Sequence, residues 1–333
     1  MEIVIRKKHQ KLLLSLLLTC MYVFMAFPIS GSAHAGEPLL VIRIAGEEYE
    51  HAVNGIRQEV GAEFLISEML IDRGTGREKV SDRMKAVSPK LVVLMDNIAI
   101  SLYKKYQDSL PAASQNPVPS ISLMASFTDI AIKKLKNATG IFYEVPVVTS
   151  IVNLRTIMPE IPIRKVGVVY RDVMKSSVQT NQGYCQQERV EMIPYPISGK
   201  KDIASELKKG LAHLRGKIDA LWVLNDSMLV NAQLIREIWH PFIRELRKPV
   251  IVGIEVLVQP KFQFGTFGVI PNHAELGMQA AEIIYNIMDD DWQAGHSEVE
   301  QPRSVYKILN MDQAEQLFGV GREQLSFVDK VLR

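Results

Sequence analysis

Short runs of consecutive apolar residues alternate with amphipathic segments along most of the chain. Runs without polar alternation are typical of parallel strands that are covered on both faces. The candidate strands form two series, residues 39–44, 64–71, 91–95 and 119–124, and then residues 165–170, 190–195, 220–224, 250–254 and 266–270. Repeated strand–helix units predict parallel sheets with right-handed crossovers. Two such series therefore predict an α/β fold of two doubly wound parallel-sheet lobes.

The segments between these runs have helical spacing. A helix is expected from about Glu48, and others over residues 79–86 and 98–107. In the second series one apolar stripe is formed by Ile203, Leu207, Leu211 and Leu214. Asn272 with Glu275 three residues later is a capping box, and it predicts a helix that buries apolar residues up to Ile287.

The first 35 residues have the pattern of a secretory signal peptide. A basic segment, residues 6–11, precedes an apolar run over residues 12–27, and Ala33-His34-Ala35 forms a small-x-small cleavage site before Gly36. An uncleaved membrane anchor is the alternative, and residues 17–20 resemble a lipoprotein box in which Thr19 replaces a smaller residue. We expect cleavage and a periplasmic location.

Removal of this segment changes the charge of the chain. The segment carries four of the 39 basic and one of the 37 acidic residues, so the net charge falls from +2 to −1. A balanced charge argues against a nucleic-acid or anionic-membrane surface. Of the two cysteines, Cys20 leaves with the signal peptide and Cys185 remains alone, so no internal disulfide can form.

The motifs of common catalytic sites are missing from the sequence. It contains no Gly-x-Ser-x-Gly, no phosphate-binding Gly-x-x-x-x-Gly-Lys-Ser/Thr and no His-Glu-x-x-His. The histidines have no metal-ligand spacing, and the acidic run 289–291 is expected to be a solvated loop. We therefore expect neither an enzyme nor a cofactor or metal.

Polar residues follow the predicted strands at the edge where open α/β sheets bind ligands. Helix starts offer N–H groups for a carboxylate, and an acidic residue such as Glu47 or Asp226 suits an ammonium group. Ordinary helix capping is the alternative explanation. The candidate ligand contacts are Tyr49, Asp96, Ser126, Ser177, Asp226 and Glu255.

Several segments resemble the tryptophan/tyrosine-binding type of ABC-transporter substrate-binding proteins. These are Asn137-Ala138-Thr139-Gly140-Ile141 with Val145-Pro146, residues 165–170 with 176–178, residues 219–227, Glu275-Leu276-Gly277 with 280–281, and Asn310 with Ala314 and Gly319. The resemblance covers roughly residues 134–320. It implies a type 1 periplasmic binding protein fold with a multi-strand hinge and a ligand in the cleft, and second-lobe contacts from Ser177, Asp226 and Glu255.

The resemblance also implies lobe boundaries, and the first half of the chain differs from the family at two positions of the cleft. One lobe is expected to comprise residues 36–141 and 271–302, and the other residues 142–270 and 303–333. Asp96-Asn97 stands where the family has Gly-Thr, and residues 124–129 replace its Asp-Pro-Val segment, so an aromatic amino acid is not carried over as the ligand.

The expected function is that of an exported, monomeric solute-binding protein of an ABC importer. Its ligand would be a small polar molecule, an amino acid or a related compound, and its partner a permease. The alternative is a periplasmic sensor that signals to a membrane kinase or cyclase.

Overall fold

The computed structural model describes residues 36–111, 117–200 and 202–333. The predicted signal peptide, residues 1–35, lies outside this part of the chain. No helix among the described residues has the length and apolar character needed to span a membrane.

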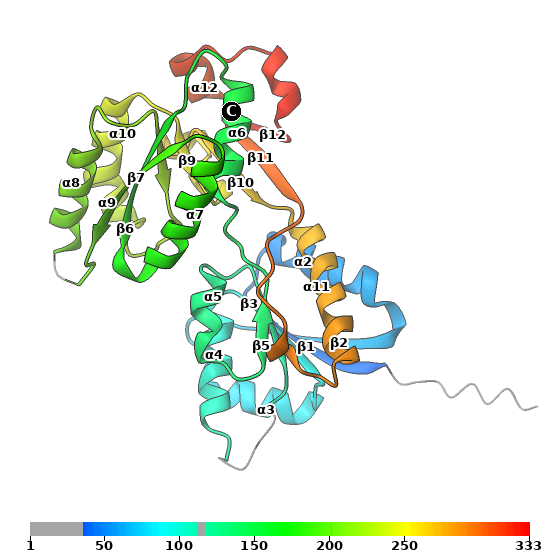
Figure 1. The fold of residues 1–333 in the computed structure, drawn as a ribbon. Helices are drawn as coiled ribbons and strands as arrows, with labels where there is room; N and C mark the ends of the chain where they lie inside the picture. Colours follow the sequence, from blue (N-terminus) through cyan, green and yellow to red (C-terminus); the bar gives the residue numbers. More distant parts are fainter. Residues whose placement is uncertain (1–35, 112–116, 201) are drawn as a thin grey trace, which may run out of the picture. The chain divides into compact units, whose positions relative to one another are not determined.

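The first sheet contains, among the described residues, five parallel strands in the order β2-β1-β3-β4-β5 (Figure 1). Its strands are β1 (Glu37–Arg43), β2 (Phe64–Leu70), β3 (Leu91–Met95), β4 (Ser120–Leu123) and β5 (Ala138–Gly140). The helices that follow these strands are α2 (Glu47–Val60), α3 (Arg77–Val87), α4 (Asn97–Asp108) and α5 (Thr128–Ala131).

The apolar run of β1 is buried on both faces of this sheet. Leu39 and Val41 belong to a core formed with α2, whereas Leu40 and Ile42 belong to a core formed with α3 and α4. Successive side chains of a strand point to opposite faces, so a strand covered twice has no polar alternation. This arrangement is the physical reason for the sequence pattern.

Helix α11 (His273–Asp289) packs against α2, although more than 200 residues separate them along the chain (Figure 1). It begins with Asn272, whose side chain accepts a hydrogen bond from the Glu275 N–H group. The predicted capping residue is therefore confirmed. Its buried residues complete the core on the α2 side of the first sheet.

The second sheet contains seven strands within the described residues, in the order β12-β11-β10-β9-β8-β6-β7. These are β6 (Lys165–Arg171), β7 (Glu191–Ile197), β8 (Ala220–Val223), β9 (Val250–Val252), β10 (Phe267–Pro271), β11 (Val305–Asn310) and β12 (Lys330–Leu332). It is covered by α6 (Val147–Ile157), α7 (Lys175–Gln187), α8 (Ile203–Leu214), α9 (Ala232–Leu234), α10 (His240–Leu246) and α12 (Met311–Phe318).

Every strand predicted from an apolar run is present in one of these sheets. β5, β11 and β12 were not predicted, and β11 runs antiparallel to β10. The second sheet is therefore mostly rather than wholly parallel. The remaining neighbours in it are paired parallel.

Three segments connect the two sheets, and they hydrogen-bond to one another. Ile141 pairs with Glu300, and the Phe142 N–H group donates to the Glu300 carbonyl over 2.9 Å. The Asn272 N–H group donates to the Ser304 carbonyl over 3.0 Å. The chain therefore crosses between the sheets along a small hydrogen-bonded ribbon.

Candidate ligand-binding site

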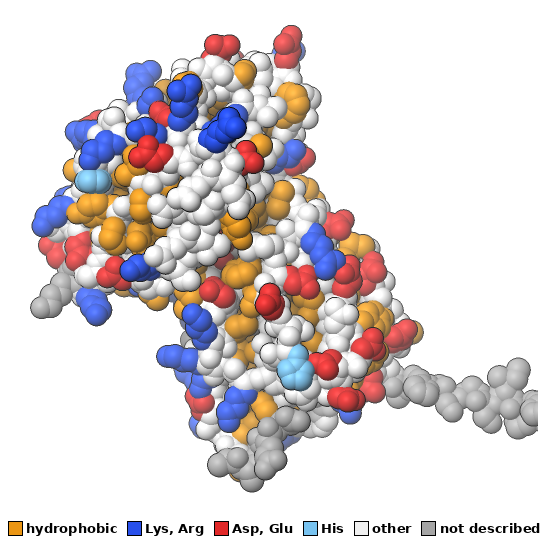
Figure 2. Space-filling model, in the orientation of Figure 1, with side chains coloured by type: hydrophobic (Ala, Val, Ile, Leu, Met, Phe, Trp, Pro, Cys, Tyr) orange, Lys and Arg blue, Asp and Glu red, His pale blue; other side chains and the backbone are white. Residues whose placement is uncertain are grey.

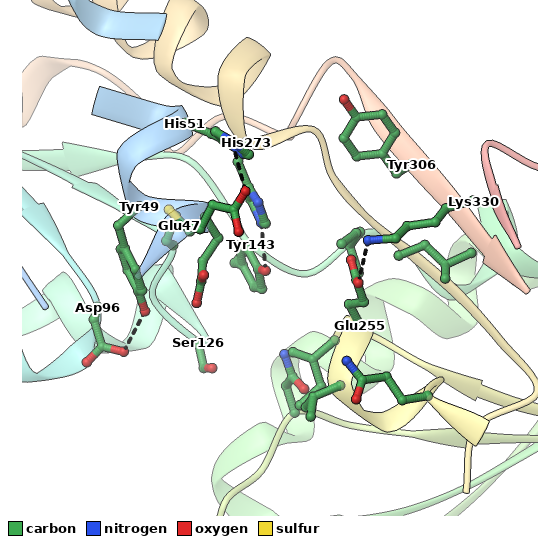
Figure 3. A pocket seen from close by; sticks show the side chains of 18 of the residues that line it. Glu47, Tyr49, His51, Asp96, Ser126, Tyr143, Glu255, His273, Tyr306 and Lys330 are labelled. Carbon is green, nitrogen blue, oxygen red and sulfur yellow. Dashed lines mark hydrogen bonds and ion pairs between the residues drawn. The ribbon is translucent and has the colours of Figure 1, made fainter. Parts of the chain in front are cut away.

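A cavity of about 730 Å³ lies among loops that follow strands of both sheets (Figure 3). We call it the cleft cavity. Figure 3 shows Tyr49, Asp96 and Ser126 on one side of it and Glu255 with Lys330 on the opposite side. The volume lies within the range of small-molecule sites.

Tyr49 and Asp96 form a hydrogen-bonded pair on the first side. The Tyr49 hydroxyl donates to Asp96 over 3.3 Å, and the Ile98 N–H group donates to the other carboxylate oxygen over 2.8 Å. Asp96 thus caps α4, and its φ of 87° is in a region that non-glycine residues rarely adopt. Strained backbone of this kind gathers at functional sites. Burial, together with the charge of Asp96, raises the pKa of Tyr49.

The loop after β4 is held by two side chains from other segments. The amide of Asn97 accepts a hydrogen bond from the Ser126 N–H group over 2.8 Å and donates to the Ser126 carbonyl over 2.9 Å. The Phe127 N–H group donates to the carboxylate of Glu144. Phe127 also has a positive φ, 54°. Ser126 is therefore held in place by its backbone contacts, and its side chain faces the cavity (Figure 3).

Tyr143 and His273 lie between the two sides, next to the segments that connect the sheets. The Tyr143 hydroxyl is 3.0 Å from His273 Nε2, and the two rings stack with centroids 5.9 Å apart. Burial lowers the pKa of His273 and thereby favours the neutral imidazole. The pair therefore contributes an aromatic, uncharged surface to the cavity.

Glu255 and Lys330 form an ion pair on the second side. Glu255 begins a short 3-10 turn, Glu255–Leu257, that follows β9, and Lys330 begins β12. Lys330 Nζ is 2.6 Å from the Glu255 carboxylate, and both side chains are partly exposed. Tyr306 of β11 lines the cavity nearby with 42 % of its surface exposed.

Four of the six predicted contact residues line the cleft cavity: Tyr49, Asp96, Ser126 and Glu255. Ser177 and Asp226 are not among the lining residues. Ser177 is in the first turns of α7, and its carbonyl accepts a hydrogen bond from Asn181. Asp226 is 3 % exposed and accepts two hydrogen bonds from the Arg171 guanidinium, over 2.6 and 2.8 Å.

Five further lining residues were not predicted from the sequence: His51, Tyr143, His273, Tyr306 and Lys330. His51 carried a usable signal, because it lies one helical turn after Glu47 in α2. Tyr143 is on a segment that connects the sheets and His273 is the first residue of α11, so neither directly follows a strand at the edge where ligands are expected. Among the described residues no group of His, Cys, Asp or Glu side chains has the geometry of a metal site.

Solved structures share this architecture over nearly the whole described chain. A substrate-binding protein with adhesive properties from Clostridium difficile, solved in a ligand-free, open form, has a TM-score of 0.61 at 15% identity and covers 89% of this chain and 99% of its own. The chain has the type 1 periplasmic binding protein fold.

Two further structures support the same fold. The ABC domain in complex with L-tryptophan from Streptococcus pneumoniae has a TM-score of 0.55 at 16% identity and covers 89% of this chain and 100% of its own. A conserved domain protein from Vibrio cholerae has a TM-score of 0.53 at 14% identity, with 89% and 99% covered. No protein-family model and no curated protein sequence matches the chain. The likeness therefore establishes the fold and not the ligand.

Proposed function

We propose that this protein is an exported solute-binding protein that captures a small polar molecule in the cleft cavity and presents it to an ABC importer. The observation that carries the proposal is the cavity itself, lined by Tyr49, Asp96 and Ser126 from one sheet and by Asn225 and Glu255 from the other. Loops at the carboxyl ends of strands are where open α/β sheets bind ligands. A ligand in this cavity would contact both lobes at once.

The proposed mechanism is closure about the three connecting segments. The lobes would be residues 36–141 with 271–302, and residues 142–270 with 303–333. A ligand favours closure only by as much as it binds the closed state better than the open one. In the closed state a ligand would contact both Asp96 and Glu255, whereas in the open state it would contact the residue of one lobe only, and this supplies the difference in affinity.

Exposed apolar side chains on the second lobe support closure. Val173, Met228 and Val256 follow β6, β8 and β9, and 44–52 % of the surface of each is exposed. Because β6, β8 and β9 are neighbours in the sheet, these side chains follow the same edge of it. Closure that covers these side chains would contribute free energy in addition to the ligand contacts.

The test uses the protein expressed from its full coding sequence and purified gently from the periplasm. Native mass spectrometry should reveal a bound small molecule, and small-angle X-ray scattering should show a smaller radius of gyration in its presence. A ligand that binds without any compaction would contradict the closure mechanism. Uptake of that molecule should fall in cells that lack the gene, and unchanged uptake would contradict the importer role.

A further inference from the structure

Carboxylates dominate the charged side chains of the cleft cavity. Its lining includes Glu47, Glu48, Asp96, Glu255 and Asp329, and Lys330 is the single Lys or Arg side chain among the described lining residues. Burial favours the neutral form of His273, which also lines the cavity. On the face drawn in Figure 2, acidic side chains are also frequent over helices α2 and α11. The cavity therefore carries a negative charge.

The cations near the cavity already have partners. Lys330 pairs with Glu255 over 2.6 Å, and Lys307, outside the lining, pairs with Asp329 over 3.7 Å. By contrast, Glu48 and Asp96 form no salt bridge within the described part of the chain. Two carboxylates therefore face the cavity without a compensating cation.

Carboxylates from both lobes act on the side chains of Tyr143 and His273, which also line the cavity. Burial is the largest cause of the raised pKa of Tyr143, and the charges of Glu48 and Glu255 add to it. The same two carboxylates oppose the effect of burial on the pKa of His273. A ligand beside Tyr143 and His273 would therefore experience both charges.

Donors for a ligand carboxylate are unevenly distributed around the cavity: the side-chain amides of Asn225 and Gln259 and the ammonium group of Lys330 line its second-lobe side, whereas backbone donors on the first-lobe side are engaged. The backbone N–H groups at the first-lobe strand ends already donate to side chains of this chain: Ile98 to Asp96, Ser126 to Asn97 and Phe127 to Glu144. Helix α2 begins without a side-chain cap, but its first turn carries three glutamates, which repel an anion. An α-amino acid whose carboxylate lies near Glu48 and Asp96 would be repelled by both charges and would find these backbone donors already engaged, which costs free energy.

Aromatic side chains complete the site. Tyr49, Tyr143 and Tyr306 line the cavity together with the carboxylates. Ring faces attract cations, and carboxylates form strong hydrogen bonds with ammonium groups. We infer that the cleft cavity selects organic cations, namely amines that carry no carboxylate, over the corresponding amino acids. This inference rests on the proposed function and narrows its ligand class.

Matched pairs of compounds that differ by one carboxylate provide the test. Isothermal titration calorimetry would compare tyramine with L-tyrosine, tryptamine with L-tryptophan, agmatine with L-arginine and cadaverine with L-lysine. We expect the best amine to bind at least about tenfold more tightly than its amino acid, with an affinity that falls as salt is added. An amino acid that binds as tightly as its amine would overturn the inference.

Substitutions in the cavity locate the effect. Glu48→Gln and Asp96→Asn keep the shape and the hydrogen-bond acceptor but remove the charge, so each should weaken amine binding about tenfold. Glu315→Gln on α12 removes an exposed charge away from the cavity and should leave the affinity unchanged. Amine binding that neither cavity substitution weakens would also overturn the inference.

Native mass spectrometry separates failure of this inference from failure of the proposed function. A cation among the molecules that copurify with the protein supports both. A neutral or anionic bound molecule leaves the solute-binding function in place and rejects the cation selectivity. Absence of any bound molecule, together with no binding across compounds of all charges, rejects both.

Discussion

The crossing of α2 and α11 gives the sharpest test of how the first lobe holds together. The helices meet at two glycines, and a Cβ atom added at Gly277 would lie 1.9 Å from the Ala52 carbonyl oxygen. One added at Gly55 would lie 2.1 Å from the Ala274 carbonyl oxygen. Both obstacles are backbone atoms, so no side-chain rotation relieves the clash. Gly277→Ala must therefore push the helices apart.

The size of the effect follows from the distance. Real Cβ contacts stay above 3.0 Å, so the backbones must separate by about 1 Å at the crossing. A gap of that size forfeits up to about half of the dispersion energy across the contact, and overpacking typically costs about 1–3 kcal/mol and sometimes more. The interface includes buried Ile56, Leu276 and Ile283. We expect Gly277→Ala to lower the free energy of unfolding by about 3 kcal/mol.

Urea unfolding followed by circular dichroism measures the change, and Gly183→Ala is the matched control. Gly183 is exposed in α7, and an added Cβ there meets no atom within 4 Å. Alanine is the better helix former, so this substitution should stabilise the protein by about 0.5–1 kcal/mol. The Gly→Ala substitution should therefore raise the free energy of unfolding at Gly183 and lower it at Gly277. A loss below about 1 kcal/mol for Gly277→Ala would refute the helix-crossing argument.

Three further predictions concern titratable and paired groups. Burial raises the pKa of Glu144 to about 7 from 4.5, so ionisation of this carboxyl destabilises the fold as the pH rises from about 4.5 to 7. Glu144→Gln should remove this loss, which is at most about 3 kcal/mol of unfolding free energy across that pH range, and an unchanged pH dependence in urea unfolding would contradict the prediction. Asp226→Asn should cost about 3 kcal/mol in urea unfolding, since it leaves Arg171 without its buried carboxylate, whereas unchanged stability with lost ligand affinity would identify Asp226 as a ligand contact. Burial raises the pKa of Cys185 to about 11, so a thiol reagent at pH 8 should label it only after unfolding, and rapid labelling of the native protein would count against its burial.

The apolar runs predicted the strands because most strands in both sheets are covered on two faces. Strand β11 has no such apolar run, because its first three residues, Val305 to Lys307, are only partly buried or exposed. β12 contributes three residues, and its pairing with β11 is all that defines it as a strand. Strands of this kind are specified by their neighbours in the sheet and not by their own hydrophobic pattern.

The role of Gly277 in helix packing could not be predicted from the sequence. In the sequence, Gly277 is one residue of the Glu275-Leu276-Gly277 segment that resembles the binding-protein family. In the structure it allows the closest approach of two helices that are far apart along the chain, and α11 thereby completes the core of the first lobe. The periodicity of α11 could be predicted from the sequence, but its partner could not.

Asp96 and Asp226 show why the site could be predicted only in part. Each is an aspartate that closely follows a buried strand, so both were predicted as ligand contacts from the tendency of open α/β sheets to bind ligands at the carboxyl ends of their strands. Arg171, 55 residues earlier in the chain, binds the carboxylate of Asp226 and buries it. Among the described residues no such cation pairs with Asp96, which lines the cavity with a tyrosine hydroxyl and a backbone N–H group as its donors. The fold determines which strand-end charge is already compensated, and a ligand is expected to bind at the charge that is not.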